Sequence, residues 1–169
     1  MSKYETLNYD VFLKEEAYEI RNYTDFLIVE YENASDPKIK DGFGSLFKYI
    51  SSDNKDNKKI SMTTPVIQEV NKDMKKMAFV APREFAEHIP EPNNSNLKVK
   101  DFEQGLFGVI RYSGLSNKSK ETKMKKRLEV WVKKKGYQRQ SNYMLAFYNP
   151  PFVLPMLRRN EIWVRITKA

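Results

Sequence analysis

The sequence predicts an α+β fold, a distorted antiparallel β-barrel built from two ββαββ repeats with one main helix in each. Residues 18–81 and 97–167 each contain two short strand-like runs, an amphipathic helix and two further strand-like runs. The repeats are most alike where residues 61–66 correspond to residues 146–152. Because neither repeat can bury its apolar face alone, we expect a single domain over residues 1–169, with a pocket at the seam between the repeats.

The composition limits the chemistry of this chain. Its 169 residues suffice for one domain with a sizeable core. The absence of cysteine excludes thiol nucleophiles, disulfides, cysteine metal clusters and covalent c-type haem attachment. No apolar run is long enough to cross a bilayer, and residues 1–6 are polar where a secretory signal would be apolar. We therefore expect a cytoplasmic monomer without a membrane partner.

The first repeat opens with a pattern of strands. Residues 1–17 hold few apolar side chains, and we expect them to form an N-terminal strap. Residues 18–21 alternate between apolar and polar side chains, and a strand-like run resumes at residues 26–31. Two such runs separated by a short polar break predict a β-hairpin.

A helix is predicted next. Asp36 and Pro37 are typical of a helix start, because proline tolerates the first helical turn. Apolar residues then recur at helical spacing and predict a core-facing stripe: Ile39, Phe43, Leu46 and Ile50. Pro65 must interrupt the strand that residues 60–63 begin, because proline cannot donate to a β-ladder. Residues 77–80 predict the strand that closes the repeat.

The second repeat has the same order of elements. It follows a proline-rich surface connection at residues 81–96. Residues 97–100 and 106–112 predict a second hairpin, and residues 143–148 and 161–166 predict the last two strands.

The helix predicted between them is strongly basic. The net charge of +8 and the pI near 9.4 raise the question of a nucleic-acid partner. Much of this charge lies on Lys118, Lys120, Lys123, Lys125, Lys126, Arg127, Lys133, Lys134 and Lys135. The apolar residues at i, i+4, i+7 and i+8, which predict a core-facing stripe, are Met124, Leu128, Trp131 and Val132. We interpret the lysines as a solvated face and expect no nucleic-acid partner, with docking of an acidic protein as an alternative.

Five strings, taken together, resemble the SOUL haem-binding protein family. They are residues 18–23 (YEIRNY), 47–50 (FKYI), 59–66 (KISMTTPV), 148–152 (YNPPF) and 158–164 (RRNEIWV). The resemblance implies two ββαββ halves in a distorted barrel, related to the GyrI-like effector-binding domains. It also implies reversible, non-covalent binding of haem or a related tetrapyrrole, for buffering or transfer.

The resemblance also implies a ligand site beside the first helix. In animal members of the family the haem cleft has been placed there, with an apolar side chain and basic groups, and the matching positions are Lys40, Phe47 and Lys48. On a helical wheel Phe47 and Lys40 border the apolar stripe, and Gly44 leaves bare backbone between them and Lys48. This patch suits a small hydrophobic anion such as haem. The competing interpretation places Phe47 at the edge of the core, Gly44 against a close neighbour and the lysines in solvent.

Iron ligation is not assigned by these residues. His88 is the single histidine, and it lies in the proline-rich connection, where a surface histidine is the simpler interpretation. The axial ligand of a bound haem is left open between a methionine, a tyrosine and water.

A second site is suggested by the GyrI-like relationship. Those relatives hold ligands between their halves with aromatic residues and a carboxylate, and some hydrolyse small electrophiles. By residue type Tyr148, Glu161 and Trp163 are the candidates here, so the alternative function is an effector binder or hydrolase. The pair Arg158 and Arg159 is interpreted as a turn beside the last strand rather than as an anion site. We assign no catalytic or metal-ligating residues, because no triad, glycine-rich phosphate loop or paired-histidine spacing occurs.

Overall fold

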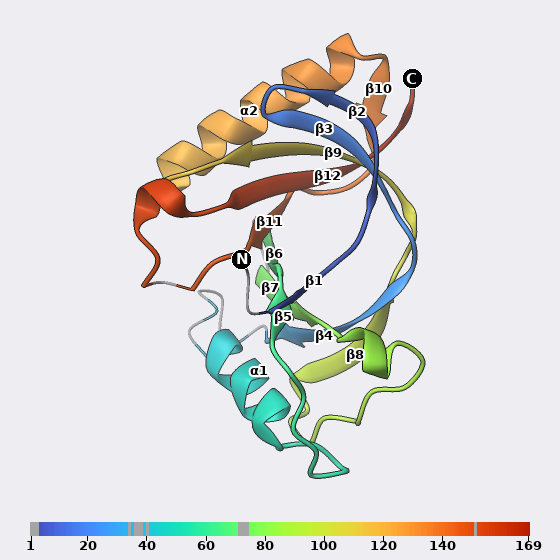
Figure 1. Cartoon of the computed structure of the whole chain (residues 1–169), viewed down its shortest axis with the longest axis vertical. Helices are drawn as coiled ribbons and strands as arrows, with labels where there is room; N and C mark the ends of the chain where they lie inside the picture. Colours follow the sequence, from blue (N-terminus) through green and yellow to red (C-terminus); the bar gives the residue numbers. More distant parts are fainter. Residues whose placement is uncertain (1–3, 34, 36–38, 40, 71–74, 151) are drawn as a thin grey trace. The chain divides into compact units, whose positions relative to one another are not determined.

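A computed structural model describes residues 4–33, 35, 39, 41–70, 75–150 and 152–169 (Figure 1). It confirms the predicted α+β class, with two main helices and antiparallel sheets. The chain forms two compact units. Unit 1 takes the described residues of 1–7 and 25–103, and unit 2 takes residues 8–24 and 104–169. The single domain expected from the sequence stays a prediction.

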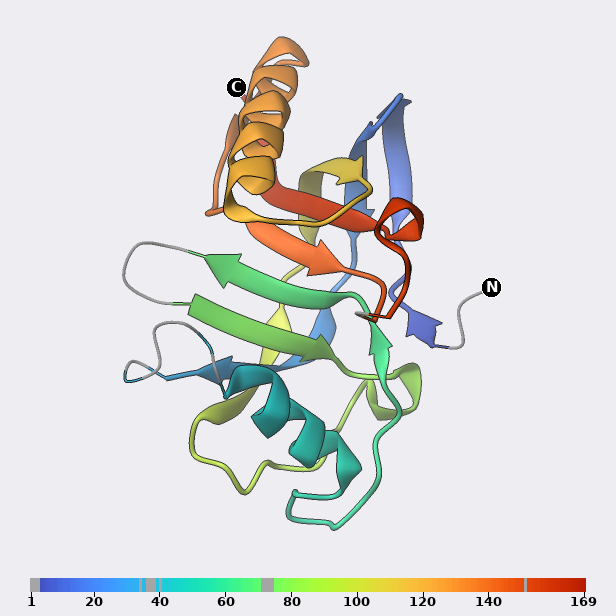
Figure 2. The same ribbon diagram turned by 90° about the vertical axis from the view of Figure 1, so that its left-hand side faces the viewer.

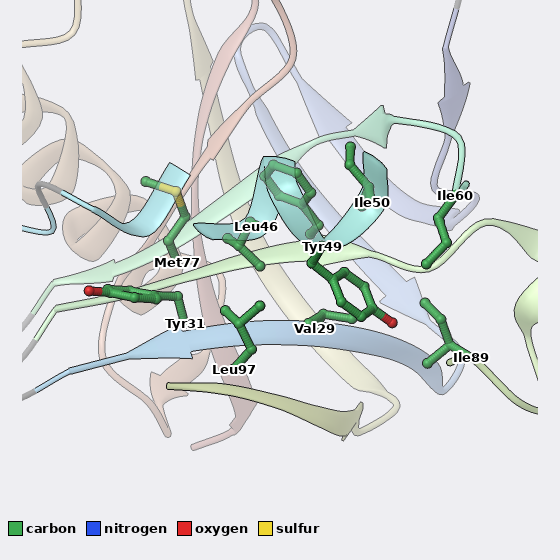
Figure 3. Packing of buried hydrophobic residues seen from close by; sticks show 10 residues of the cluster. Val29, Tyr31, Leu46, Tyr49, Ile50, Ile60, Met77, Ile89 and Leu97 are labelled. Carbon is green, nitrogen blue, oxygen red and sulfur yellow. The ribbon is translucent and has the colours of Figure 1, made fainter. Parts of the chain in front are cut away.

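Unit 1 is a four-stranded antiparallel sheet with a helix on it. Its elements are β1 (Glu5–Thr6), β4 (Phe26–Glu32), α1 (Gly42–Ser51), β5 (Thr63–Thr64), β6 (Val66–Val70), β7 (Lys75–Val80), η1 (Arg83–Phe85) and β8 (Leu97–Phe102). The sheet runs in the order β6-β7-β4-β8, while β1 and β5 form a separate parallel pair. α1 packs on β4 and β7 (Figure 2). Figure 3 shows Leu46 and Tyr49 of α1 in the core with Val29 and Tyr31 of β4.

Unit 2 has its own sheet and helix. Its elements are β2 (Asp10–Glu15), β3 (Tyr18–Tyr23), β9 (Gly105–Tyr112), α2 (Lys118–Lys134), β10 (Tyr137–Arg139), β11 (Met144–Phe147), η2 (Pro155–Leu157) and β12 (Asn160–Lys168). The strand order is β2-β3-β9-β12-β11, and β10 also pairs with β12. α2 packs on β9, β10 and β12.

Both predicted hairpins are wrong, because strands are exchanged between the repeats. β3 does not pair with β4; it pairs with β9, where Tyr18 faces Ile110. β8 likewise pairs with β4 instead of β9, where Phe26 faces Phe102. A two-residue hairpin requires positive φ in its loop, and neither residue between β3 and β4 has it. The chain therefore continues past the break, and each strand finds its partner in the other repeat.

The predicted stripe of the first helix is rotated in the structure. α1 begins at Gly42, so Ile39 precedes it with a φ of 54°, and the predicted start at Asp36 and Pro37 lies outside the described residues. Phe43 is 49% exposed instead of buried. The buried residues of the helix are Gly42, Leu46, Tyr49 and Ile50. The cause lies at the first turn, because a Cβ on Gly42 would stand 2.3 Å from Ile39 Cγ2, so the bare glycine lets Ile39 pack over it.

The second helix agrees with its pattern. α2 buries the four predicted residues Met124, Leu128, Trp131 and Val132. Its first turn is capped by the Asn117 side chain, which accepts a hydrogen bond of 2.8 Å from the backbone N–H of Lys120. Pro65 also has its predicted effect, because it separates β5 from β6. The strap expected at residues 1–17 contributes strands to both units, β1 to unit 1 and β2 to unit 2.

Candidate functional site

The exposed face of α1 carries two stacked aromatic rings. Phe43 and Phe47 are one helical turn apart, with ring centroids separated by 6.2 Å and planes inclined by 18°. The two side chains are 49% and 53% exposed. Phe43 also meets the buried ring of Phe79 edge-on at 5.8 Å, which anchors the pair to the core. We call Phe43, Gly44, Phe47 and Lys48 the α1 aromatic face.

At Gly44 and Lys48 the surface is hollowed. A Cβ placed on Gly44 would have no heavy atom within 4 Å, so this glycine does not serve close packing. The hollow has a volume of about 300 Å³ and is lined by Tyr31, Asn33, Asp41, Gly44, Ser45, Lys48 and Asn96. Lys48 is exposed in the last turn of the helix. The structure thus brings Gly44, Phe47 and Lys48 onto one exposed face, while Lys40 lies outside the described residues.

No metal centre is recognisable in the part of the chain that the structure describes. No group of three or more His, Asp or Glu side chains there is arranged to hold a metal ion. His88 is exposed in the loop after η1. Of the residues lining the hollow, Tyr31 is of a type that can ligate haem iron, but it is buried and its hydroxyl accepts a hydrogen bond of 3.3 Å from Asn33 Nδ2.

The second candidate set lies in a buried ion cluster of unit 2. Glu161 is fully buried. Each of its carboxylate oxygens accepts a hydrogen bond of 2.7 Å from one terminal nitrogen of the Arg21 guanidinium. Arg21 is also fully buried, and it donates to the hydroxyl of Tyr23 at 2.9 Å and to Glu19 at 2.8 Å. The pair is therefore bidentate and removed from water.

Further donors complete the shell of Glu161. Trp163 Nε1 donates to Oε1 at 2.9 Å, and Arg159 Nε donates to Oε2 at 3.0 Å. Burial by itself would raise the pKa of Glu161, but the hydrogen bond and charge of Arg21, helped by Arg159, hold that pKa below its ordinary value. Each oxygen of this carboxylate therefore accepts two hydrogen bonds, which stabilise its charged form.

Tyr148 lies against the same cluster. The Arg159 guanidinium lies 3.9 Å from the centroid of the Tyr148 ring. The Tyr148 hydroxyl is buried without a hydrogen-bond partner among the described residues. Burial, followed by the charge of Glu161, raises the pKa of this phenol well above its ordinary value. A cationic ligand approaching Glu161 would have to displace Arg21, which already occupies both carboxylate oxygens. The effector-binding or hydrolase function stays a prediction.

Arg21 and Glu19 were not selected from the sequence. Glu19, Arg21 and Tyr23 alternate on β3, so they share one face of the strand. That face is buried, and so is Ile20 on the opposite face. The sequence does contain a sign of this cluster. Within residues 18–23, which resemble the SOUL family, the charged residues Glu19 and Arg21 stand at alternate positions of a predicted strand.

The pattern of the SOUL heme-binding protein family matches residues 4–165. The chain belongs to the SOUL heme-binding protein family. This SOUL chain is also similar to Heme-binding protein 1 of Xenopus laevis, with 23% identity over 157 residues that cover 87% of this chain and 82% of that protein.

Solved structures of similar fold come from other proteins. The C-terminal domain of EcmrR has a TM-score of 0.64 at 11% identity, covering 90% of this SOUL chain and 98% of the domain. In a complex of EcmrR with DNA the TM-score is 0.66 at 12% identity, covering 92% of this chain and 59% of that one. A hydrolase from Listeria innocua has a TM-score of 0.65 at 10% identity, covering 92% and 94%. At these identities the likeness establishes the fold alone.

No helix among the described residues combines the length and the apolar character needed to span a membrane.

Proposed function

We propose that this SOUL protein binds haem or a related tetrapyrrole reversibly and without covalent attachment on the α1 aromatic face, for buffering or transfer. The observation that carries the proposal is the stacked pair of Phe43 and Phe47, held half-exposed against the core by Phe79. Membership of a family described as heme-binding supports the choice of ligand. The name of the Xenopus laevis relative supports it as well.

The chemistry of this face suits a flat ring with acidic substituents. If a porphyrin covered the exposed half of each ring, roughly 100 Å² per side chain would leave water, which favours binding by about 2 to 3 kcal/mol for each ring. The open space at Gly44 lets the ligand approach the helix backbone. Lys48 supplies a cation for a propionate, and Lys40 is proposed as a second from the family pattern.

The proposed role of these side chains is to bind and orient the ring, and the axial ligand of the iron is left open. Haem, when bound, would supply the redox and ligand-binding chemistry of its iron. The proposed contacts are made by the aromatic side chains with the porphyrin ring and by the lysines with its carboxylates, and none involves the iron. Metal-free protoporphyrin is therefore expected to bind at the same face.

Hemin titration tests the proposal. A saturable shift of the Soret band is expected, and Phe47→Ser should weaken binding by roughly tenfold or more, because about 2 kcal/mol of ring contact is lost. Phe12→Ser is the matched control, since Phe12 is 65% exposed on β2. Absorbance that rises linearly and is removed by competing albumin would refute binding.

Charge variants test the orientation of the ligand. Lys48→Glu should weaken the binding of hemin, and Asp41→Asn should strengthen it, because the Asp41 carboxylate lines the same hollow and opposes a propionate. Lys126→Glu on α2 makes the same charge change as Lys48→Glu at another exposed site. Equal effects of both Lys→Glu variants would indicate a general charge effect and place the ligand elsewhere.

A further inference from the structure

Unit 2 exposes a cluster of large apolar side chains that the proposed ligand site does not use. Phe152 is 85% exposed and Met156 is 75% exposed, whereas apolar side chains of this size are usually covered. Leu154, Leu157 and Leu115 are between 59% and 67% exposed. We call these five residues the apolar tip. Contiguous exposed apolar groups of this kind mark interaction sites.

Hydrogen bonds hold the apolar tip in its exposed position. The backbone N–H of Gly114 donates to the carbonyl of Pro155 at 2.8 Å, which ties the loop of Leu115 to η2. The backbone N–H of Leu157 donates to the carbonyl of Leu154 at 2.9 Å. Arg158 Nε donates to the carbonyl of Val153, also at 2.9 Å. These bonds satisfy backbone groups of the loop and join it to the segment that carries Leu115.

Positive charge lies at the base of the apolar tip. A shallow hollow of about 640 Å³ is lined by Glu16, Ala17, Arg111, Tyr112, Ser113, Met156, Leu157, Arg158 and Arg159. Arg111 and Arg158 thus line, with Glu16, a hollow that two residues of the tip share, while Arg159 beside them is paired with Glu161. Lys118, which is exposed, begins α2 three residues after Leu115. The apolar tip is therefore backed by cations.

We propose that the apolar tip docks this protein onto the surface of an anionic lipid bilayer, in contrast to the expectation from the sequence of no membrane partner. The tip side chains would enter the boundary between headgroups and acyl chains, and Arg111 and Arg158 would meet the lipid phosphates. A bilayer fits these observations. The protruding apolar side chains would reach its apolar interior, while the arginines at their base would stay at its anionic surface. It also accepts protruding side chains without the complementary shape that a protein partner needs. The net charge of +8 adds long-range attraction to such a surface.

Sedimentation with lipid vesicles tests the proposal. The full chain should bind vesicles of phosphatidylcholine that contain about 30% phosphatidylserine, bind vesicles of pure phosphatidylcholine far more weakly, and dissociate as salt is added. The double variant Phe152→Ser with Met156→Ser should lose at least about tenfold in binding. Arg111→Gln should lower the preference for anionic vesicles. Val130→Ser, at a 56% exposed site on α2, should bind like the unchanged protein.

A fluorescent reporter locates the contact. Phe152→Trp should shift its emission to shorter wavelength on anionic vesicles and be quenched by brominated acyl chains, whereas Val130→Trp should do neither. The altered side chains are exposed, so circular dichroism and thermal unfolding should be unchanged in every variant. Retained binding by the Phe152 and Met156 double variant would overturn the proposal. Loss of binding on Lys123→Glu with Lys126→Glu alone would assign the contact to α2, and no binding at low salt would exclude a lipid surface.

Discussion

Replacement of Arg21 by methionine should destabilise unit 2 strongly at neutral pH. Methionine fills much of the same volume but leaves the buried Glu161 carboxylate without its bidentate partner. Removing one member of a buried ion pair costs about 3 to 5 kcal/mol of unfolding free energy. Arg159 and Trp163 still donate to Glu161, so we expect the lower end, about 3 kcal/mol.

The loss of stability should depend on pH. In the unchanged protein the folded-state pKa of Glu161 is lowered, so its ionisation contributes stability that is lost as the pH falls through that pKa. Without Arg21, burial becomes the dominant effect and raises the pKa of Glu161, so the folded variant takes up a proton. At neutral pH this uptake costs free energy, but near pH 4 the unfolded chain is protonated as well. The difference between variant and unchanged protein should therefore shrink as the pH falls.

Urea unfolding at several pH values measures this difference. Lys100→Met is the matched control, because Lys100 and Glu30 form a pair of the same 2.7 Å length with 41% of the lysine side chain exposed, and it should cost about 1 kcal/mol or less. Adding Glu161→Leu to Arg21→Met should recover part of the loss, because the buried Glu161 charge is then removed while Glu19 still lacks Arg21. A loss below about 1 kcal/mol at neutral pH, or one that does not change with pH, would refute the reasoning.

Two further predictions concern the helices. Gly42→Ala should lower the free energy of unfolding by about 1 to 3 kcal/mol, because the new methyl would overlap Ile39. Gly44→Ala should raise the free energy of unfolding by about 0.5 to 1 kcal/mol, because the new methyl has no neighbour within 4 Å and alanine favours the helix. Thermal unfolding distinguishes the two, and a loss at both sites would show that Gly44 is packed. In α2, Leu128→Ala should cost about 2 to 5 kcal/mol and Val130→Ala less than about 0.5 kcal/mol, as measured by urea unfolding. Equal costs would mean that the buried face has been wrongly assigned.

The α2 helix shows where sequence reasoning succeeded. Its buried apolar residues follow a single helical period over about two and a half turns, and every other position of the helix except Val130 is polar or charged. With so little ambiguity, the buried face follows from periodicity alone. The fold class and the break at Pro65 were also predictable, because they depend on the order of local patterns and on the missing N–H of proline.

Three of the four residues of the α1 aromatic face were predicted from the sequence, and their role in binding stays a prediction. The sequence indicates Gly44, Phe47 and Lys48, but its helical spacing predicts Phe43 in the core, where the structure does not place it. In a helix of ten residues the apolar side chains cover too much of the surface for periodicity to define one face. In the structure Ile39 packs over Gly42, and with the helix in this orientation the Phe43 ring is exposed and stacks on Phe47.

By itself the sequence determined the family, the α+β class, the two helices and the buried stripe of α2, because each of these depends on patterns within a short stretch of chain. The tertiary structure alone decided that β3 pairs with β9 and β4 with β8. It also decided that Arg21 meets Glu161, 140 residues away. Contacts between residues so far apart in the chain depend on which strands pair and on which side chains pack together in the core. No pattern within a short stretch of sequence contains that information.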